Sequence, residues 1–245
     1  INYRQHQRPF GVAPPCADDS VFFTRQSQID SFLIDNPLCT VLRKIIIDGS
    51  GASPAITQLD GLQNITQVTE LLSIQNTSIT DLSDFVALTQ IDGPLYLKYN
   101  NLLTGIGLNN LTKLGGMELR VLPALTTING ITNNIDSIFG HVRFDSVGIT
   151  NLSELNGIVY INGDLEVSNT AITTLSGINT LRRLNYLYLN NDTLLSSVGL
   201  TQIDSTYGFL FGNLPVLSSL GPLSYELDSK SIFTFWFINT PQLTS

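Results

Sequence analysis

Carboxylates that recur at one position of a repeating pattern are the residues of this 245-residue chain best suited to acid–base chemistry. Glu118 and Glu166 occupy the same place in their repeats, and Arg143 stands at that place between them. Enzymes that cleave polysaccharides need two or three carboxyl groups close together. Because a full repeat bearing a cation separates these two, the pattern favours binding, and a polysaccharide-active enzyme remains an alternative.

The histidines and cysteines form no pattern typical of a nucleophile or a metal site. His6 lies in an unpatterned N-terminal stretch, and His141 precedes a short apolar segment. The sequence contains no Gly-x-Ser-x-Gly elbow, no glycine-rich phosphate loop and no cluster of metal ligands. We therefore expect a protein that is not an enzyme and has no catalytic residues, metal or cofactor.

Cys16 and Cys39 are the only cysteines, and no histidine lies near Cys39. Their spacing differs from that of a zinc knuckle, so we interpret them as one disulfide, which implies an oxidising compartment. Two free buried thiols are the alternative.

The composition excludes several classes of partner. Charged residues make up 13% of the chain, and the net charge is −8 with only 12 Lys and Arg. Such a surface would not neutralise nucleic-acid phosphates or anionic lipids, so we expect no nucleic-acid partner. No apolar run approaches the roughly 18 to 20 residues that span a bilayer, so we expect no membrane insertion.

Short apolar-x-apolar segments recur every 22 to 27 residues along the chain. The third residues of these segments are Ile47, Ile74, Leu97, Leu119, Phe144, Val167, Leu189, Phe211 and Phe237. One such unit cannot bury its apolar face, but stacked units can, and alternation turns the first and third residues inward. The pattern predicts an all-β fold, namely a parallel β-solenoid of about nine coils that is similar to a leucine-rich repeat.

Two polar columns accompany the repeat. Asparagines stand two residues after the third strand position, at Asn76, Asn169, Asn191, Asn213 and Asn239. We interpret them as an inward ladder that satisfies backbone groups at a turn, with a chance column of surface residues as the alternative. A second column, running from Thr57 to Thr173 and continued by serines, suggests ice binding, but threonine at a corner more often bonds local backbone.

The chain divides into three parts. Residues 1–15 form an N-terminal arm, 16–44 a disulfide-tied cap, and 45–245 the solenoid repeats, of which the last is expected to be truncated. The cap contains a short amphipathic segment with Ile29, Phe32 and Leu33 on one side and Ser27 as the predicted N-cap. We expect this helix to cover the first coil.

The stretch Leu165–Ile178, with Asn169 and the apolar pair Ile172 and Leu175, resembles the receptor L-domain. That family has a right-handed β-helix and occurs in growth-factor and insulin receptor ectodomains, fungal GPI-anchored wall proteins and secreted bacterial surface proteins. The opening of the chain, a cysteine, a helix bearing Ser27 and Gln28, and a second cysteine, also resembles the family's cap. The resemblance covers about residues 16–245 and implies an extracellular or cell-surface location. The chain lacks the flanking cysteine-rich modules and has more coils than one such domain, so growth-factor binding is not implied.

The outward strand positions give the predicted partner-binding surface. Its candidate residues are Tyr96, Lys98, Arg120, Arg143, Glu166, Tyr188 and Trp236. Aromatic and arginine side chains on a rigid surface suit contact with a protein or a glycan. A plain solvated face, or binding through loops or an edge, are the alternatives.

Five Asn-x-Ser/Thr sequons occur in the chain. Those at Asn64, Asn110 and Asn151 fall in predicted loops and are candidate N-glycosylation sites. Asn76 and Asn191 belong to the predicted inward ladder and are expected to escape modification.

The sequence therefore predicts an extracellular recognition or adhesion module that binds a protein or glycan partner at a cell surface. A structural component of a cell wall or surface layer, without a discrete site, is the main alternative. A polysaccharide-active enzyme and an ice-binding protein are the others, and the sequence indicates no oligomeric state.

Overall fold

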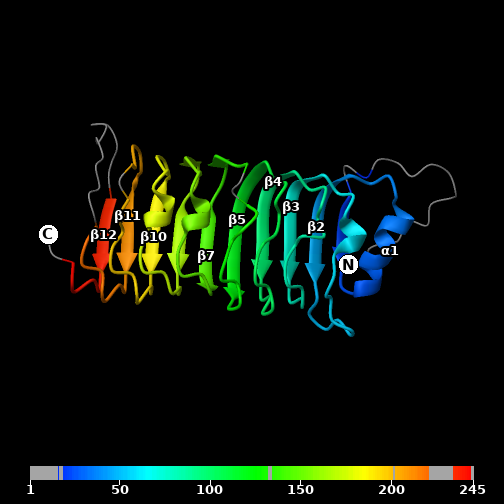
Figure 1. The fold of residues 1–245 in the computed structure, drawn as a ribbon, viewed down its shortest axis with the longest axis horizontal. Helices are drawn as coiled ribbons and strands as arrows, with labels where there is room; N and C mark the ends of the chain where they lie inside the picture. The colour runs from blue at the N-terminus through cyan, green and yellow to red at the C-terminus, as the bar shows by residue number, and fades with distance from the viewer. Residues whose placement is uncertain (1–15, 17–18, 132–133, 201, 221–233, 244–245) are drawn as a thin grey trace.

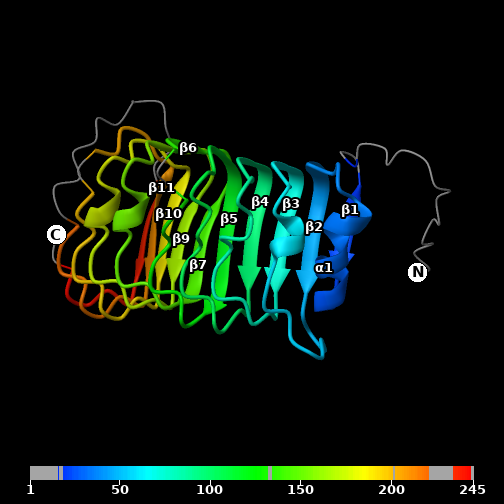
Figure 2. The same ribbon diagram turned by 45° about the vertical axis from the view of Figure 1, so that its right-hand side comes forward.

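The computed structural model describes residues 16, 19–131, 134–200, 202–220 and 234–243. These residues form an elongated rod in which parallel strands lie side by side along one wall (Figure 1). Figure 2 shows loops closing the coils behind that wall. The predicted N-terminal arm, residues 1–15, lies outside the described residues.

Ten strands form the main path of one sheet, and every neighbouring pair along it is parallel. In order they are β1 (Ser20–Phe23), β2 (Val41–Asp48), β3 (Gln67–Gln75), β4 (Gln90–Lys98), β5 (Lys113–Leu122), β7 (Val142–Val147), β9 (Leu165–Ser168), β10 (Tyr186–Asn190), β11 (Gly208–Gly212) and β12 (Thr234–Ile238). The shorter elements are α1 (Gln26–Asp35), η1 (Asp60–Leu62), β6 (Ser137–Ile138), η2 (Ser153–Leu155), β8 (Tyr160–Ile161) and η3 (Ser176–Ile178). The predicted parallel β-solenoid of about nine coils is confirmed.

The register is the one that the repeat predicts. Leu97 pairs with Leu119, and Leu119 with Phe144, and all three side chains are fully buried. At the last described strand, Phe235 and Phe237 align with core residues of β11 but stay 46% and 36% exposed, since no described coil follows. The apolar face of each coil is therefore covered by the next, as stacking requires.

The N-terminal cap is confirmed, and it adds a strand that the pattern did not predict. The disulfide joins Cys16 and Cys39, whose Cα atoms lie 5.5 Å apart. Strand β1 pairs with β2, so the sheet begins inside the predicted cap, and β2 starts at Val41, before residue 45. Strand β1 has only four residues and its sequence does not match the repeat, so the pattern could not reveal it.

Helix α1 covers the first coil, as expected, but the predicted N-cap is wrong. Ser27 lies inside the helix, and the Gln28 side chain instead accepts the backbone N–H of Arg25 at 3.0 Å. Ile29 and Phe32 are the buried residues of the helix. A Cβ on Gly61 would lie 1.8 Å from the carbonyl oxygen of Ile29. Helix α1 therefore packs so closely against η1 that only glycine fits at this position.

The asparagine ladder exists, but its predicted direction is wrong. Asn76, Asn169, Asn191, Asn213 and Asn239 are exposed, and each has φ between 53° and 59°. Asparagine tolerates this left-handed conformation, which turns the chain at the end of each strand and leaves the side chain outside. The side chains bond from coil to coil, as where Asn239 Nδ2 donates to Asn213 Oδ1 at 2.8 Å.

The inward polar position is one residue further on. Asn100 and Asp192 are fully buried. Asn100 Oδ1 accepts the backbone N–H and the hydroxyl of Thr77, and Asp192 Oδ1 accepts the same two groups of Thr170. We had predicted that the asparagine ladder satisfies backbone groups at the turn. The buried residues Asn100 and Asp192 have this role instead.

The threonine and serine column bonds the backbone of the preceding coil. Thr104 Oγ1 donates to the carbonyl of Thr80 at 3.3 Å, and Ser196 Oγ does the same to Thr173 at 3.3 Å. These bonds fit the interpretation that threonine serves the corner.

Candidate ligand-binding face

The parallel register places the predicted partner-binding residues in two adjacent columns on the outer face of the sheet. The first column, from β4 to β12, is Tyr96, Glu118, Arg143, Glu166, Tyr188, Leu210 and Trp236. The second, two residues further along each strand, includes Lys98, Arg120, Asp145, Ser168 and Asn190. Each step along a column is one strand spacing, about 4.8 Å.

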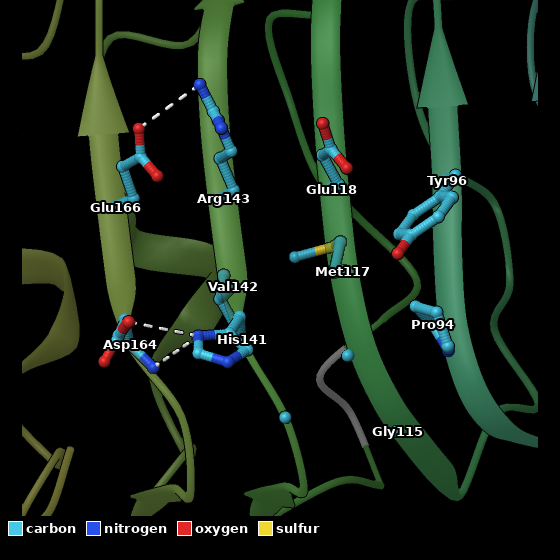
Figure 3. Close-up of a pocket in the computed structure, with 12 residues that line it drawn as sticks. Pro94, Tyr96, Gly115, Met117, Glu118, His141, Val142, Arg143, Asp164 and Glu166 are labelled. Atoms are coloured by element: carbon cyan, nitrogen blue, oxygen red, sulfur yellow. Dashed lines mark hydrogen bonds and ion pairs between the residues drawn. The ribbon is translucent and has the colours of Figure 1, made fainter. Parts of the chain in front are cut away.

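A hollow of about 360 Å³ lies over β4, β5, β7 and β9 (Figure 3). The polar and aromatic side chains that line it are those of Tyr96, Glu118, His141, Arg143, Asp164 and Glu166. It brings three of the seven predicted residues together, namely Tyr96, Arg143 and Glu166. Four neighbouring coils therefore build one concave site from residues separated by up to 70 positions in the sequence.

Ion pairs across the strands hold the charged groups of this hollow. Glu118 Oε2 lies 3.0 Å from Lys98 Nζ, and Glu166 Oε1 lies 3.3 Å from Arg143 Nη2. Arg143 Nη2 is also 3.3 Å from Asp145 Oδ2. Surface ion pairs of this kind add little stability, but a network of them restricts the motion of the side chains.

Lys98 and Arg120 line neither this hollow nor the next one, but both contact residues of the face. Lys98 Nζ lies 4.4 Å from the centroid of the Tyr96 ring, within reach of a cation–π contact. Arg120 Nε lies 3.2 Å from Asp145 Oδ2. The prediction that Lys98 and Arg120 bind the partner stays a prediction.

Two carboxylates of the face have displaced pKa values in opposite directions. Burial raises the pKa of Glu166, and the charge of Arg143 offsets this only in part. Burial also acts to raise the pKa of Asp145, but hydrogen bonds from Asn169 and Ser146, with the neighbouring arginines, bring it below its usual value. Asp145, which pairs with Arg143, therefore stays ionised to a lower pH than usual. Glu166 is more readily protonated than Asp145.

His141 and Asp164, which we had not assigned to the face, belong to the hollow. His141 Nδ1 lies 3.2 Å from Asp164 Oδ2 and accepts the Asp164 backbone N–H at 3.1 Å (Figure 3). The His141 side chain is 71% exposed. Both residues precede their strands, outside the strict alternation from which the face was predicted.

Two members of a glycine column, Gly115 and Gly140, line the same hollow. Gly93, Gly115, Gly140 and Gly163 each stand two residues before the apolar-x-apolar segment of four successive coils. A Cβ on Gly115 would lie 2.0 Å from the carbonyl oxygen of Asp92, and one on Gly140 2.5 Å from that of Gly115. The backbones therefore approach too closely for any side chain here. This spacing was readable in the sequence and could have located the hollow.

A second hollow of about 330 Å³ continues the face toward β12. It is lined by Glu166, Tyr188, Asn190, Leu210, Gly212 and Trp236, among others. Glu166 lines both hollows, so the two share a wall. Burial raises the pKa of the Tyr188 hydroxyl, and Trp236 is 57% exposed.

All five sequon asparagines lie at the surface. The candidates Asn64, Asn110 and Asn151 are exposed, and so are Asn76 and Asn191, which we had expected to be buried. The burial argument against modification at the last two was therefore wrong, because the left-handed turn directs their side chains outward.

Within the part of the chain that the structure describes, no three His, Cys, Asp or Glu side chains are grouped so that they could hold a metal ion. The helices in that part are all too short or too polar to cross a membrane. A scan against family models and searches of curated proteins and of solved structures found no match to this chain.

Proposed function

We propose that this protein is a recognition module that binds a partner through the outer face of its parallel sheet, between Tyr96 and Trp236. The observation that carries the proposal is the pair of joined hollows, which concentrates aromatic, arginine and carboxylate side chains on a rigid wall. Concave sites with a few well-placed polar groups are the usual form of binding sites.

An extracellular or cell-surface location fits this function. The Cys16–Cys39 disulfide is typical of proteins that fold in an oxidising compartment. The resemblance of the repeat and the cap to the receptor L-domain points the same way, and we propose that the chain is a divergent relative of that family.

Combined substitution of Tyr96, Arg143 and Tyr188 by alanine tests the proposal. We expect attachment of the purified protein to its source cells or cell-wall material to be lost, while the melting temperature changes little because all three side chains are partly exposed. A matched control replaces Tyr160, Arg182 and Tyr207, which also lie at the surface but line neither hollow.

Unchanged attachment of the triple variant contradicts recognition through this face. It would instead favour a structural component of a wall or surface layer, in which the stiffness of the stacked coils is the functional property.

A further inference from the structure

The joined hollows run across the strands and therefore along the rod. From Tyr96 on β4 to Trp236 on β12 there are six strand-to-strand steps. At about 4.8 Å a step, the face is about 29 Å long. A groove of this length suits an extended chain with a short repeat, since each coil can offer an equivalent contact to each unit of the ligand.

The floor of this face alternates donors and acceptors. Glu118, Arg143 and Glu166 follow one another on β5, β7 and β9. Their side chains are 20%, 36% and 35% exposed. Ionised carboxylates only accept hydrogen bonds and guanidinium only donates them, whereas a hydroxyl group does both. A polyhydroxylated chain is therefore a ligand that can satisfy all three groups with one kind of group.

The charge of the hollow selects against an anionic chain. Three carboxylates, Glu118, Asp164 and Glu166, line the first hollow with a single arginine. The whole protein carries a net charge of −8. Acidic polysaccharides would be repelled by this surplus, whereas uncharged sugars would not.

The far end of the face offers two aromatic rings, those of Tyr188 and Trp236. Tyr188 and Trp236 are two strands apart, with Leu210 between them, which gives about 10 Å from one ring-bearing strand to the other. Rings provide rigid apolar area at a low entropy cost. The apolar faces of sugar rings can pack against such surfaces at successive points along a chain.

Building on the proposed function of the sheet face, we propose that its ligand is a linear, uncharged hexose polymer lying along the rod axis. Glu118, Arg143 and Glu166 bind its hydroxyl groups, and Tyr188 and Trp236 pack against its rings. No bond of the sugar is made or broken in this interaction.

Calorimetric titration with defined oligosaccharides tests the proposal. The probes are uncharged linear series from disaccharide to hexasaccharide, in β-1,4-, β-1,3- and α-1,4-linked glucose and β-1,4-linked mannose, with a hexagalacturonate and an oligolysine peptide for comparison. We expect one uncharged series to bind with an affinity that rises with length and changes little over about a tenfold range of salt, because no counterion is released.

Substitutions then locate the site. Glu166→Gln should weaken binding of the hexasaccharide roughly 10- to 100-fold, as expected for loss of one charge-assisted hydrogen bond. In Tyr188→Ala, the affinity should rise less steeply with the length of the oligosaccharide, because one ring contact is lost. The controls are Glu70→Gln, an ion-paired surface carboxylate outside both hollows, and Tyr160→Ala. Trp236→Ala replaces Glu166→Gln if that variant does not fold.

Binding of hexagalacturonate or oligolysine in preference to every uncharged sugar overturns the proposal. Sugar binding that is weakened neither by Tyr188→Ala nor by Glu166→Gln, or its replacement Trp236→Ala, also overturns it. If no sugar binds but combined substitution of Tyr96, Arg143 and Tyr188 abolishes attachment to cells, the glycan proposal fails and the recognition function stands. If neither sugar binding nor attachment responds to the face, both proposals fail.

Discussion

Replacement of the buried Asp192 by asparagine should stabilise the protein at neutral pH. Asp192 is fully buried, and its Oδ2 has no hydrogen-bond partner within the described part of the chain. Burial raises the pKa of this carboxyl group, and hydrogen bonds from Thr170 and from the backbone of Asn190 offset the effect only in part. The group therefore opposes folding when it must be ionised.

Asn100 shows what the substitution would gain. It occupies the same place in its own coil, three residues after the third strand position, and accepts the same two bonds from Thr77. Its Nδ2 also donates to the carbonyl of Ile74 at 2.9 Å. The equivalent carbonyl for residue 192 is that of Val167, which is aligned with Leu189 as Ile74 is with Leu97. By analogy with Asn100, the amide nitrogen of Asp192→Asn is expected to donate to this carbonyl, where Oδ2 of Asp192 has no partner.

The expected gain follows from these contacts. A buried polar atom left unsatisfied costs about 1–3 kcal/mol, so the free energy of unfolding should rise by about that amount at pH 7. Because the folded pKa is raised, the contribution of Asp192 to wild-type stability is complete below its usual pKa and is lost as the pH rises through the folded value. The advantage of the variant should therefore shrink toward zero near pH 3.

Urea unfolding followed by circular dichroism between pH 3 and pH 8 measures the effect, with thermal melting as a second readout, at about 2–4 °C per kcal/mol for a chain of this size. Asn100→Asp is the reciprocal variant and should lose about 1–3 kcal/mol at pH 7. Asp204→Asn, which removes an exposed carboxylate paired with Arg182, is the control and should change stability by less than about 1 kcal/mol. A loss of stability in Asp192→Asn at pH 7, or a gain independent of pH, would refute the reasoning.

Three further predictions, made with four substitutions, test the fold. Replacing Cys16 by serine should lower the stability by about 2–4 kcal/mol, and a reductant should lower the melting temperature of the wild type but not of this variant, because the bond to Cys39 is already absent. Phe144→Ala should cost about 3–5 kcal/mol in urea unfolding, since this fully buried ring fills the core beneath the face; a cost under 1 kcal/mol would contradict the stacked core. Gly140→Ala should be destabilising, because its Cβ would lie 2.5 Å from the carbonyl oxygen of Gly115, whereas Gly51→Ala, where no atom lies within 4 Å of the added carbon, should cost less despite its positive φ. Equal melting temperatures of the two glycine variants would show that the close approach of the coils is not required.

The sequence by itself determined the repeat, the core and the two outward columns. Inward and outward positions alternate strictly along a strand, and residues one repeat apart must stack if apolar faces are to be covered, so Leu97, Leu119 and Phe144 were placed correctly from spacing alone. The cap helix and the disulfide followed from equally local signals.

The tertiary structure decided what happens where the alternation ends. At the turn, a residue in the left-handed conformation changes the direction in which the side chains point. The asparagines of the ladder therefore lie outside, and Asn100 and Asp192 lie inside. The sequence pattern also could not predict the shape of the face. Its hollows depend on backbone approaches at glycines such as Gly115 and on which neighbour each charge of the column pairs with, as Arg143 does with Glu166. Periodicity fixes which residues share a surface, whereas the depth and the chemistry of that surface arise from contacts between coils.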